Sequence, residues 1–309
     1  MNIKPTERAC WCGHRVLEPY SDDYRVCRAC GTLVSRAPAV EGLYSMEYWT
    51  ERQTGHHGLP NIQDRARLDL PERCAHWLRR LLELRLPPGR VLDVGCAHGG
   101  YVALLGWAGF EAIGTEINPW AARFAHETFG VKVLAGAVED QDLKEGSFDV
   151  IVLNDVIEHL PDPVKTIGHC VRLLARDGFF MIQTPEYVEH LSYADLKRTN
   201  DLFLKHMDRN NEEHLYLFSR RSAEMFFFRL GFPCIDFSTP VYPYDTSFVA
   251  SRVQIKSTDE ASVAGALSSR PIGRLVQALL DKARESTDRW WAIRRLEDKT
   301  DVPRGSKER

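Results

Sequence analysis

The chain has 309 residues, of which 44% are hydrophobic and 27% charged, a composition typical of a globular protein with one large core and smaller attachments. Its formal charge of −3 lacks the basic excess of a protein whose whole surface neutralises nucleic-acid phosphates. No apolar run reaches the roughly 18 residues of a membrane-spanning helix, and the first residues lack the apolar core of a signal peptide, so we expect a soluble, cytoplasmic protein.

The first 40 residues contain four of the eight cysteines in two close pairs, Cys10 with Cys12 and Cys27 with Cys30. So short a segment, poor in apolar periodicity, cannot bury a core without a cross-link or a metal. Four thiolates can close a tetrahedral Zn²⁺ site, so we expect a small module with a structural zinc ion. Because only one residue separates the first pair, His14 is an alternative to Cys10 as the fourth ligand. The other cysteines are scattered among apolar segments and are expected to be buried.

Residues 41–88 are interpreted as a helical linker or lid segment. An aromatic stretch and a loop precede a helical pattern from about residue 62 to residue 84, which Pro87-Pro88-Gly89 ends. From residue 89 to about residue 256, short β-rich runs alternate with helical ones, which predicts a doubly wound α/β sheet with helices on both faces of parallel strands. The expected strands lie at residues 91–94, 112–115, 131–134, 148–153, 179–182, 234–237 and 248–255.

Three further segments complete the expected organisation. Residues 217–230 are predicted to form a helix that Gly231 ends. An insertion at about 187–214, rich in charge and aromatic residues, is long enough to cover a pocket. In the tail, residues 257–309, apolar residues recur at spacings of three and four: Ile272, Leu275, Val276, Leu279, Leu280 and Ala283. This pattern predicts a helix that docks either on the body or on a partner. In the second case the helix would form the interface of a homodimer. The last residues, from Val302, are expected to be disordered.

The strongest chemical signal is a strand that runs into a glycine-rich turn opening a helix, from Val91 to Gly100. Gly95 and Gly99 would let backbone amides approach a ligand closely. Twenty-three residues after Asp93, the next strand ends in Glu116, whose carboxylate can accept both hydroxyls of a ribose. A nicotinamide dehydrogenase also uses a glycine turn and an acidic residue, but the later half of the chain contains no hydride-transfer constellation that supports this alternative.

Residues 146–163, with the run Asp155-Val156-Ile157-Glu158-His159-Leu160, resemble the class I S-adenosylmethionine-dependent methyltransferases of the small-molecule branch. The resemblance covers about residues 85–240 and implies a seven-stranded Rossmann-like sheet. It implies these cofactor-binding residues: Asp93, Gly95 and Gly99 at the methionine part, Glu116 with Ile117 at the ribose, Val138 and Glu139 at the adenine, and Asn154 and Asp155 near the sulfonium. The chain departs from the family at Ala97, where the middle glycine of the turn often stands.

Two histidines are candidates for the catalytic step. His159 follows the fourth strand, where the methyl group must leave sulfur, and a neutral imidazole there can accept a proton. His214 belongs to the segment Glu213-His214-Leu215, which resembles one common in this branch and is expected near the acceptor. A packing role is the alternative for both. Weaker candidates are His56, His57, His190 and His206.

The first 40 residues also resemble the zinc-ribbon modules that precede the methyltransferase domain in some sugar and natural-product methyltransferases. The favoured function is therefore methylation of a small-molecule or sugar acceptor in a biosynthetic pathway. An alternative is methylation of RNA or protein, with the zinc module as docking surface, although nucleic acid is not the expected partner. A third is a regulatory protein that binds the cofactor without turnover, against which the intact Glu116 and Asp155 to His159 segment argue.

Overall fold

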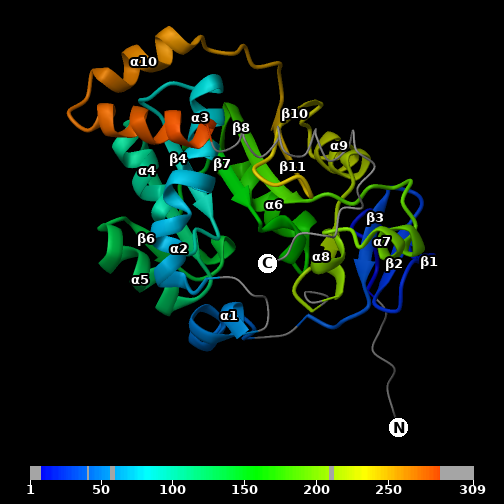
Figure 1. Cartoon of the computed structure of the whole chain (residues 1–309). Helices are drawn as coiled ribbons and strands as arrows, with labels where there is room; N and C mark the ends of the chain where they lie inside the picture. Colours follow the sequence, from blue (N-terminus) through cyan, green and yellow to red (C-terminus); the bar gives the residue numbers. More distant parts are fainter. Residues whose placement is uncertain (1–7, 40–41, 56–59, 209–211, 286–309) are drawn as a thin grey trace.

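The computed structural model describes residues 8–39, 42–55, 60–208 and 212–285. It contains a seven-stranded sheet of order β10-β11-β8-β7-β4-β5-β6 and a four-stranded sheet of order β1-β2-β3-β9. Figure 1 shows the large sheet in the body of the molecule and the small sheet at its side, next to α7. None of the helices in these ranges is long and apolar enough to cross a membrane.

The large sheet is the doubly wound sheet that the alternating pattern predicts. Five of its strands are parallel to one another: β4 (Arg90–Val94), β5 (Glu111–Glu116), β6 (Val133–Ala135), β7 (Phe148–Asn154) and β8 (Leu174–Pro185). Of the last two, β11 (Asp245–Ser251) pairs antiparallel with β8 on one side and with β10 (Cys234–Ser238) on the other. The sequence predicts these two strands without a direction, and they pair antiparallel because residues 239–244 are too few for a crossover, which needs about a dozen residues or more.

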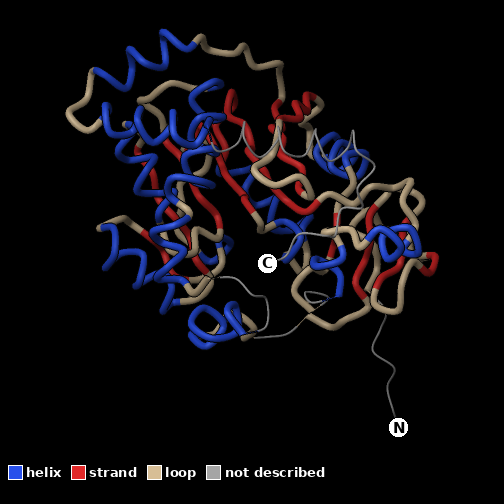
Figure 2. Tube along the Cα trace, in the orientation of Figure 1, coloured by secondary structure: helices blue, strands red, loops and turns tan. Residues whose placement is uncertain are grey.

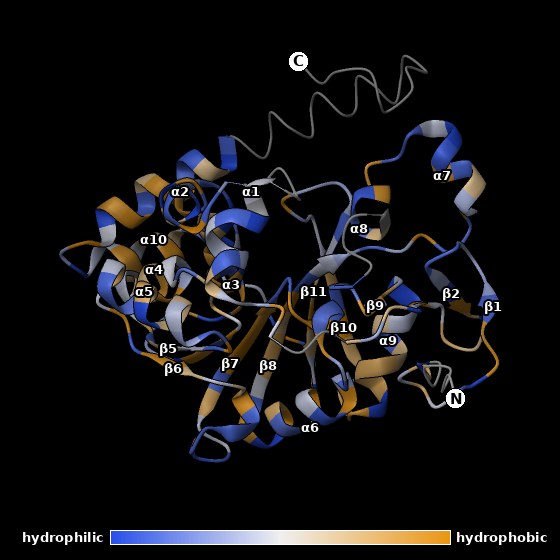
Figure 3. Cartoon of the chain, turned by 90° about the horizontal axis from the view of Figure 1, so that it is seen from below, coloured by the Kyte–Doolittle hydropathy of each residue, from blue (hydrophilic) through white to orange (hydrophobic). Residues whose placement is uncertain are grey.

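Helices cover both faces of the large sheet (Figure 2). One core joins side chains of β4, β7 and β8 to α6 (Pro163–Leu173) and α9 (Arg220–Arg229). The alternate side chains of the same strands join α3 (Ala75–Leu84) and α4 (Gly100–Ala108) in a second core. Consecutive strand residues point to opposite faces, so strands buried on both sides must be apolar throughout. Figure 3 shows hydrophobic residues along β7 and β8 between the helices.

The linker between the two sheets is helical, as expected. It contains a π-helical turn (Tyr48–Arg52) and a short α1 (Gln53–Gly55). The predicted helical pattern from residue 62 is present as α2 (Ile62–Leu68), a second π-helical turn (Leu70–Cys74) and α3. A π-helical turn has more residues per turn than an α-helix, so the turn at Leu70–Cys74 changes which side chains face the body of the protein. Arg73 is one of the residues in this turn.

The four-stranded sheet combines the amino-terminal module with a distant segment. Strands β1 (Glu18–Pro19), β2 (Tyr24–Cys27) and β3 (Thr32–Ser35) are antiparallel, and β9 (Tyr216–Leu217) pairs with β3. The predicted start of the helix at residue 217 is therefore wrong. Tyr216 and Leu217 extend along β3, and α9 begins only at Arg220, after Ser219 caps it by accepting from the Ser222 N–H.

The insertion packs on this small sheet. Its helices are α7 (Tyr193–Thr199) and α8 (Leu204–Asp208), and both lie beside the module in Figure 1. Leu196 of α7, Met207 of α8 and Phe203, just before α8, belong to a core shared with Tyr24 and Leu33 of the module. The module thus completes its core with residues of the methyltransferase-like body, which explains how so short a segment is buried.

The tail docks on the body of its own chain. After α10 (Glu260–Ser268), a helix over residues 273–285 packs on the face of the large sheet that α3 and α4 cover. Val276, Leu280 and Ala283 are buried there, whereas Leu275 is exposed. Residues from Val302 onward lie outside the described part of the chain.

Candidate functional site

A cavity of about 1170 Å³ opens at the carboxyl ends of β4, β5 and β7. The neighbours β5 and β7 lie on opposite sides of β4, so the chain order reverses at this strand. Ligands of open α/β sheets bind in the crevice at such a switch point. The volume exceeds the roughly 300–1,000 Å³ typical of a pocket for one small ligand, so there is room for two ligands side by side.

The turn after β4 has the conformation that the glycine pattern predicts. Gly95 and Gly99 have φ of 71° and 76°, and a Cβ atom on them would lie 2.8 Å from Val156 and 2.7 Å from Ala125. Ala97 also has a positive φ of 47°, so the position that departs from the family still adopts the glycine-like backbone. The result is a tight cradle whose backbone faces the cavity, with Gly99 behind it at the start of α4.

Glu116 connects this turn to the next helix. Its carboxylate accepts hydrogen bonds from the Ala97 N–H and the Asn118 N–H, each at 3.0 Å, and its side chain is only 4% exposed. Asn118 in turn caps α5 (Pro119–Phe129) by accepting from the Ala121 N–H. A carboxylate offers about four acceptor sites, so Glu116 can also accept hydroxyls of a ligand. Burial raises the pKa of Glu116, and the backbone hydrogen bonds oppose that shift.

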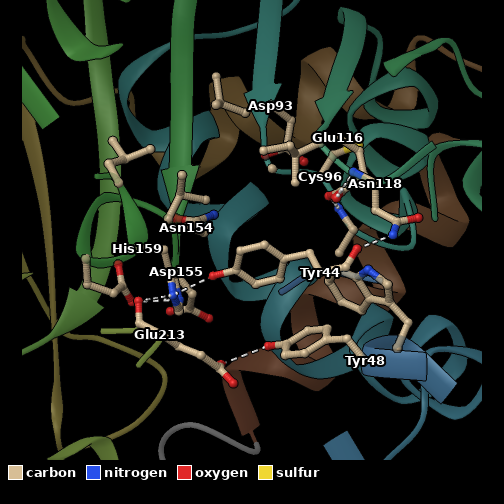
Figure 4. A pocket seen from close by; sticks show the side chains of 18 of the residues that line it. Tyr44, Tyr48, Asp93, Cys96, Glu116, Asn118, Asn154, Asp155, His159 and Glu213 are labelled. Carbon is tan, nitrogen blue, oxygen red and sulfur yellow. Dashed lines mark hydrogen bonds and ion pairs between the residues drawn. The ribbon is translucent and has the colours of Figure 1, made fainter. Parts of the chain in front are cut away.

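Asp93 is buried beside Glu116 in the same cavity (Figure 4). Burial, and then the charge of Glu116, raises the pKa of Asp93 from 3.8 to about 8. Below pH 4 the carboxyl group is protonated in both the folded and the unfolded chain. As the pH rises toward 8, the unfolded chain releases a proton that the folded chain retains, so unfolding becomes more favourable.

Asp93→Asn is therefore expected to stabilise the cofactor-free protein, by an amount that is small at pH 4 and grows up to about pH 8. The melting temperatures of the variant and the parent, measured across this range without cofactor, check this. Asp142→Asn, at an exposed position of the same domain, serves as the control. A stabilisation by Asp93→Asn that is the same at pH 4 and pH 8 would contradict the assignment.

Asn154 ends β7 with an unpaired amide. Both its side-chain nitrogen and its oxygen are buried without a hydrogen-bond partner among the described residues, and the residue lines the cavity (Figure 4). Buried polar groups are normally paired, so this amide indicates a polar ligand. The residues predicted from the resemblance also line the cavity, apart from Gly99: Asp93, Gly95, Glu116, Ile117, Val138, Glu139, Asn154 and Asp155. Val138 and Glu139 lie in a 3₁₀ turn, Val138–Asp140, after β6.

Asp155 is held by an arginine that the sequence did not reveal. Arg73 forms an ion pair with the Asp155 carboxylate and lies over the rings of Trp77 and Tyr242, 5.2 and 5.6 Å from their centroids. Gln183 donates to the other Asp155 oxygen at 3.3 Å. Arg73 stands in an ordinary helical pattern, so only the tertiary structure shows that it faces the cavity.

The two candidate histidines meet at the other end of the cavity. His159 lies in a 3₁₀ turn, Ile157–His159, and its ring centroid is 4.8 Å from that of His214. His159 Nδ1 lies 3.0 Å from the Glu213 carbonyl oxygen, and His214 Nδ1 lies 2.9 Å from the His206 carbonyl oxygen. A carbonyl oxygen can only accept, so both carbonyl contacts favour a hydrogen on Nδ1, which leaves Nε2 as the proton-accepting atom. At His159 the Tyr44 hydroxyl, 2.9 Å from the same Nδ1, then acts as a second acceptor.

Of the weaker histidine candidates, one lines the cavity, one lies away from it, and two are outside the described residues. His206 also lines the cavity, where it stacks on His214, and burial lowers its pKa to about 4. His190 is exposed and is not among the cavity-lining residues. His56 and His57 lie outside the described residues.

An aromatic segment before the first π-helical turn closes the cavity. The Tyr44 carbonyl accepts from the Asn118 side chain, next to Glu116, and the Tyr44 hydroxyl lies 2.9 Å from His159 Nδ1. The Tyr48 hydroxyl donates to the Glu213 carboxylate at 3.1 Å. This segment thus spans both ends of the cavity (Figure 4). The sequence offers only the run of aromatic residues as a signal for this role.

The four amino-terminal cysteines form a second site. The sulfur atoms of Cys10 and Cys30 are 3.4 Å apart, those of Cys12 and Cys27 are 3.6 Å apart, and all four lie within 4.8 Å of one another. Four thiols gathered in this way suit a tetrahedral zinc ion. Among the described residues, the metal-ligating group at this site contains Cys10 and not His14.

Part of the sequence is similar to that of known methyltransferases. A "probable S-adenosylmethionine-dependent methyltransferase" of Mycobacterium tuberculosis is 28% identical over 120 residues, which cover 37% of this chain and 44% of that protein. A "ubiquinone biosynthesis O-methyltransferase" of Xanthomonas campestris pv. campestris is 30% identical over 105 residues, covering 32% of this chain and 44% of that protein. The chain therefore spans under half the length of these curated relatives.

A solved structure and a family model also match the chain. A SAM-dependent methyltransferase from Archaeoglobus fulgidus superposes with a TM-score of 0.46 at 18% identity, covering 57% of this chain and 92% of that one. The methyltransferase domain family matches residues 66–236, more than half of the chain. The matched region includes the glycine cradle, Glu116, Asn154 and the two facing histidines. The chain belongs to the methyltransferase domain family.

Proposed function

We propose that this enzyme methylates a hydroxyl group of a small-molecule acceptor in a biosynthetic pathway. The observation that carries the proposal is the pair of imidazoles, His159 and His214, each with Nδ1 at a backbone carbonyl and Nε2 as the accepting atom. A hydroxyl acceptor has a proton to lose during transfer, so a positioned base suits it. The name of the Xanthomonas relatives, O-methyltransferase, also favours an oxygen acceptor.

The cavity favours an acceptor of modest size. Its volume suits two small ligands, and its far end is lined by aromatic and polar side chains, among them Tyr242, Tyr244 and His206. The Tyr44 segment covers this space and would keep water from the reacting atoms. A partly aromatic cavity of this size is better matched to a small organic molecule than to a polymer.

S-adenosylmethionine, when bound, supplies a methyl group on an already activated sulfonium. The protein's contribution is then alignment and proton removal. The glycine cradle would hold the methionine part, Asn154 would lie beside the sulfonium, and Glu116 would accept the ribose hydroxyls. His159 Nε2 takes the acceptor proton, while Glu213 and Tyr44 fix the ring and His214 packs against it.

The test uses S-adenosylmethionine with a radioactive methyl group. The enzyme is incubated in parallel with a panel of phenols, catechols and sugars, with total RNA and with a protein extract. We expect label in members of the small-molecule panel. Label confined to RNA or protein would overturn the proposal in favour of a macromolecular acceptor, and cofactor binding without turnover on any of the three would favour a regulatory protein.

We also propose that Cys10, Cys12, Cys27 and Cys30 hold one structural zinc ion per chain. The gathered sulfur atoms support this, and a closed four-ligand site has no open position for an activated water. Elemental analysis of protein prepared without chelator checks the stoichiometry, and protein without zinc would contradict the proposal.

Cys27→Ser is expected to increase hydrogen exchange in residues 8–39 and in β9, because metal binding contributes folding free energy to so small a module. The protected strands β7 and β8 of the large sheet should change little. Cys234→Ser, at a cysteine of β10 outside the cluster, is the matched control. Loss of protection in the large sheet would show that the zinc module is integral to the main core.

A further inference from the structure

The segment Glu213–Leu215 is fixed from two sides. From the module, the Tyr24 hydroxyl donates to the His214 carbonyl at 2.9 Å, and the Ser35 N–H donates to the Leu215 carbonyl at 3.0 Å. On the other side, the Leu215 N–H donates to the Glu158 carbonyl at 2.8 Å. The carbonyl of Glu213 faces His159 Nδ1. The backbone that carries His214 and orients His159 is thus held by hydrogen bonds to the module on one side and to the turn after β7 on the other.

The side chain of Tyr24 is held in place by the packing of the module. It is fully buried in the core that the module shares with the insertion. It also begins the strand β2, which ends at Cys27 of the cysteine cluster. A strand of four residues spans only about 10 Å, so the cysteine cluster and the His214 backbone are linked by one short, paired element.

We propose that Tyr24 is a positioning residue for the acceptor-side histidines, and that the amino-terminal module is therefore part of the catalytic site. This inference rests on the proposed function, in which His159 and His214 act on the acceptor. Without the phenol, the buried His214 carbonyl would lose this donor, and the segment could shift toward other partners. A shift of about 1 Å in a catalytic group can cost about a hundredfold in rate.

The test compares two tyrosines of the same module. Tyr24→Phe removes only the hydroxyl, and Tyr20→Phe is the matched control, because the Tyr20 hydroxyl donates to the Leu191 carbonyl at 3.0 Å, in the insertion. The full chain is labelled with ¹⁵N in its histidine side chains and bound to S-adenosylhomocysteine. The ring-nitrogen shifts report the tautomers of His159 and His214, whose signals are assigned with His159→Ala and His214→Ala.

We expect the parent protein and Tyr20→Phe to show the Nδ1–H tautomer for both histidines. In Tyr24→Phe, the His214 and His159 signals should shift or show mixed tautomers, with turnover on the best acceptor of the hydroxyl panel lowered about 10- to 100-fold and S-adenosylhomocysteine affinity unchanged. Unaltered signals in Tyr24→Phe would overturn the inference. So would equal changes in Tyr20→Phe, or a Tyr24→Phe protein that does not fold, because each would identify a general structural role.

Failure of the proposed function would appear differently. If His159→Ala and His214→Ala both retain turnover, neither histidine is the base, whatever the tautomers in Tyr24→Phe show. The inference would then be overturned as a statement about catalysis. The spectra would still show whether Tyr24 orients the two rings, so the two failures can be told apart.

Discussion

His159→Ala is expected to lower turnover at least about a hundredfold while affinity for S-adenosylmethionine stays nearly unchanged. A group that accepts a proton in the chemical step contributes typically about 10²- to 10⁴-fold in rate. Figure 4 shows His159 and Glu116 at opposite ends of the site, so removing the imidazole should spare the ribose end. Steady-state kcat on the best panel acceptor, with the cofactor Kd and the melting temperature, separates loss of chemistry from loss of folding.

The matched control for this variant is His190→Ala, at an exposed histidine outside the cavity lining, which should leave kcat unchanged. His214→Ala is measured alongside, because the two rings are in contact. A fall of less than about fivefold in His159→Ala would show that His159 is not the base. A hundredfold fall in His214→Ala alone would then assign the proton to His214.

Glu116→Ala is expected to weaken binding of S-adenosylhomocysteine about thirtyfold. A hydrogen-bonded charged acceptor contributes about 2 kcal/mol, and 1.4 kcal/mol corresponds to a factor of ten in Kd. The variant also leaves the buried N–H groups of Ala97 and Asn118 without their acceptor, so its melting temperature should fall as well. Calorimetric titration well below that temperature isolates the effect on binding.

Glu111→Ala is the matched control, because Glu111 begins the same strand at its exposed end, where it pairs with Arg90 at 3.5 Å. It should change neither cofactor affinity nor stability appreciably, since an exposed ion pair contributes about 1 kcal/mol or less. Unchanged affinity in a folded Glu116→Ala protein would remove Glu116 from the ribose site.

The cofactor side of the site could be predicted from the sequence because its residues follow the ends of strands. Asp93 is the last residue but one of β4, Glu116 and Asn154 end β5 and β7, and the carboxyl ends of parallel strands meet at one edge of a sheet. Gly95 could be recognised from the sequence because the turn after β4 requires glycine there: the backbone has a positive φ, and a side chain would collide with Val156. At these residues the local sequence pattern is therefore enough to predict the position in the folded protein.

The acceptor side could not be predicted in the same way. Arg73 and Tyr44 reach the cavity from the linker, and their neighbours Asp155 and His159 are far away in the sequence. Their local sequence resembles that of any helical or aromatic segment. The predicted start of α9 is wrong for a similar reason. The apolar Leu217 fits the pattern of a helical face, and only the folded structure shows that it pairs with β3 instead.

The pairing of β3 with β9 has a consequence for synthesis of the chain on the ribosome. Val34 pairs with Tyr216, so the last strand of the small sheet emerges 182 residues after its neighbour, the difference between the two numbers. At roughly 5–20 residues per second, that interval lasts about 10–40 s. The small sheet therefore cannot be completed until this delay has passed, although three of its four strands are synthesised before the large sheet.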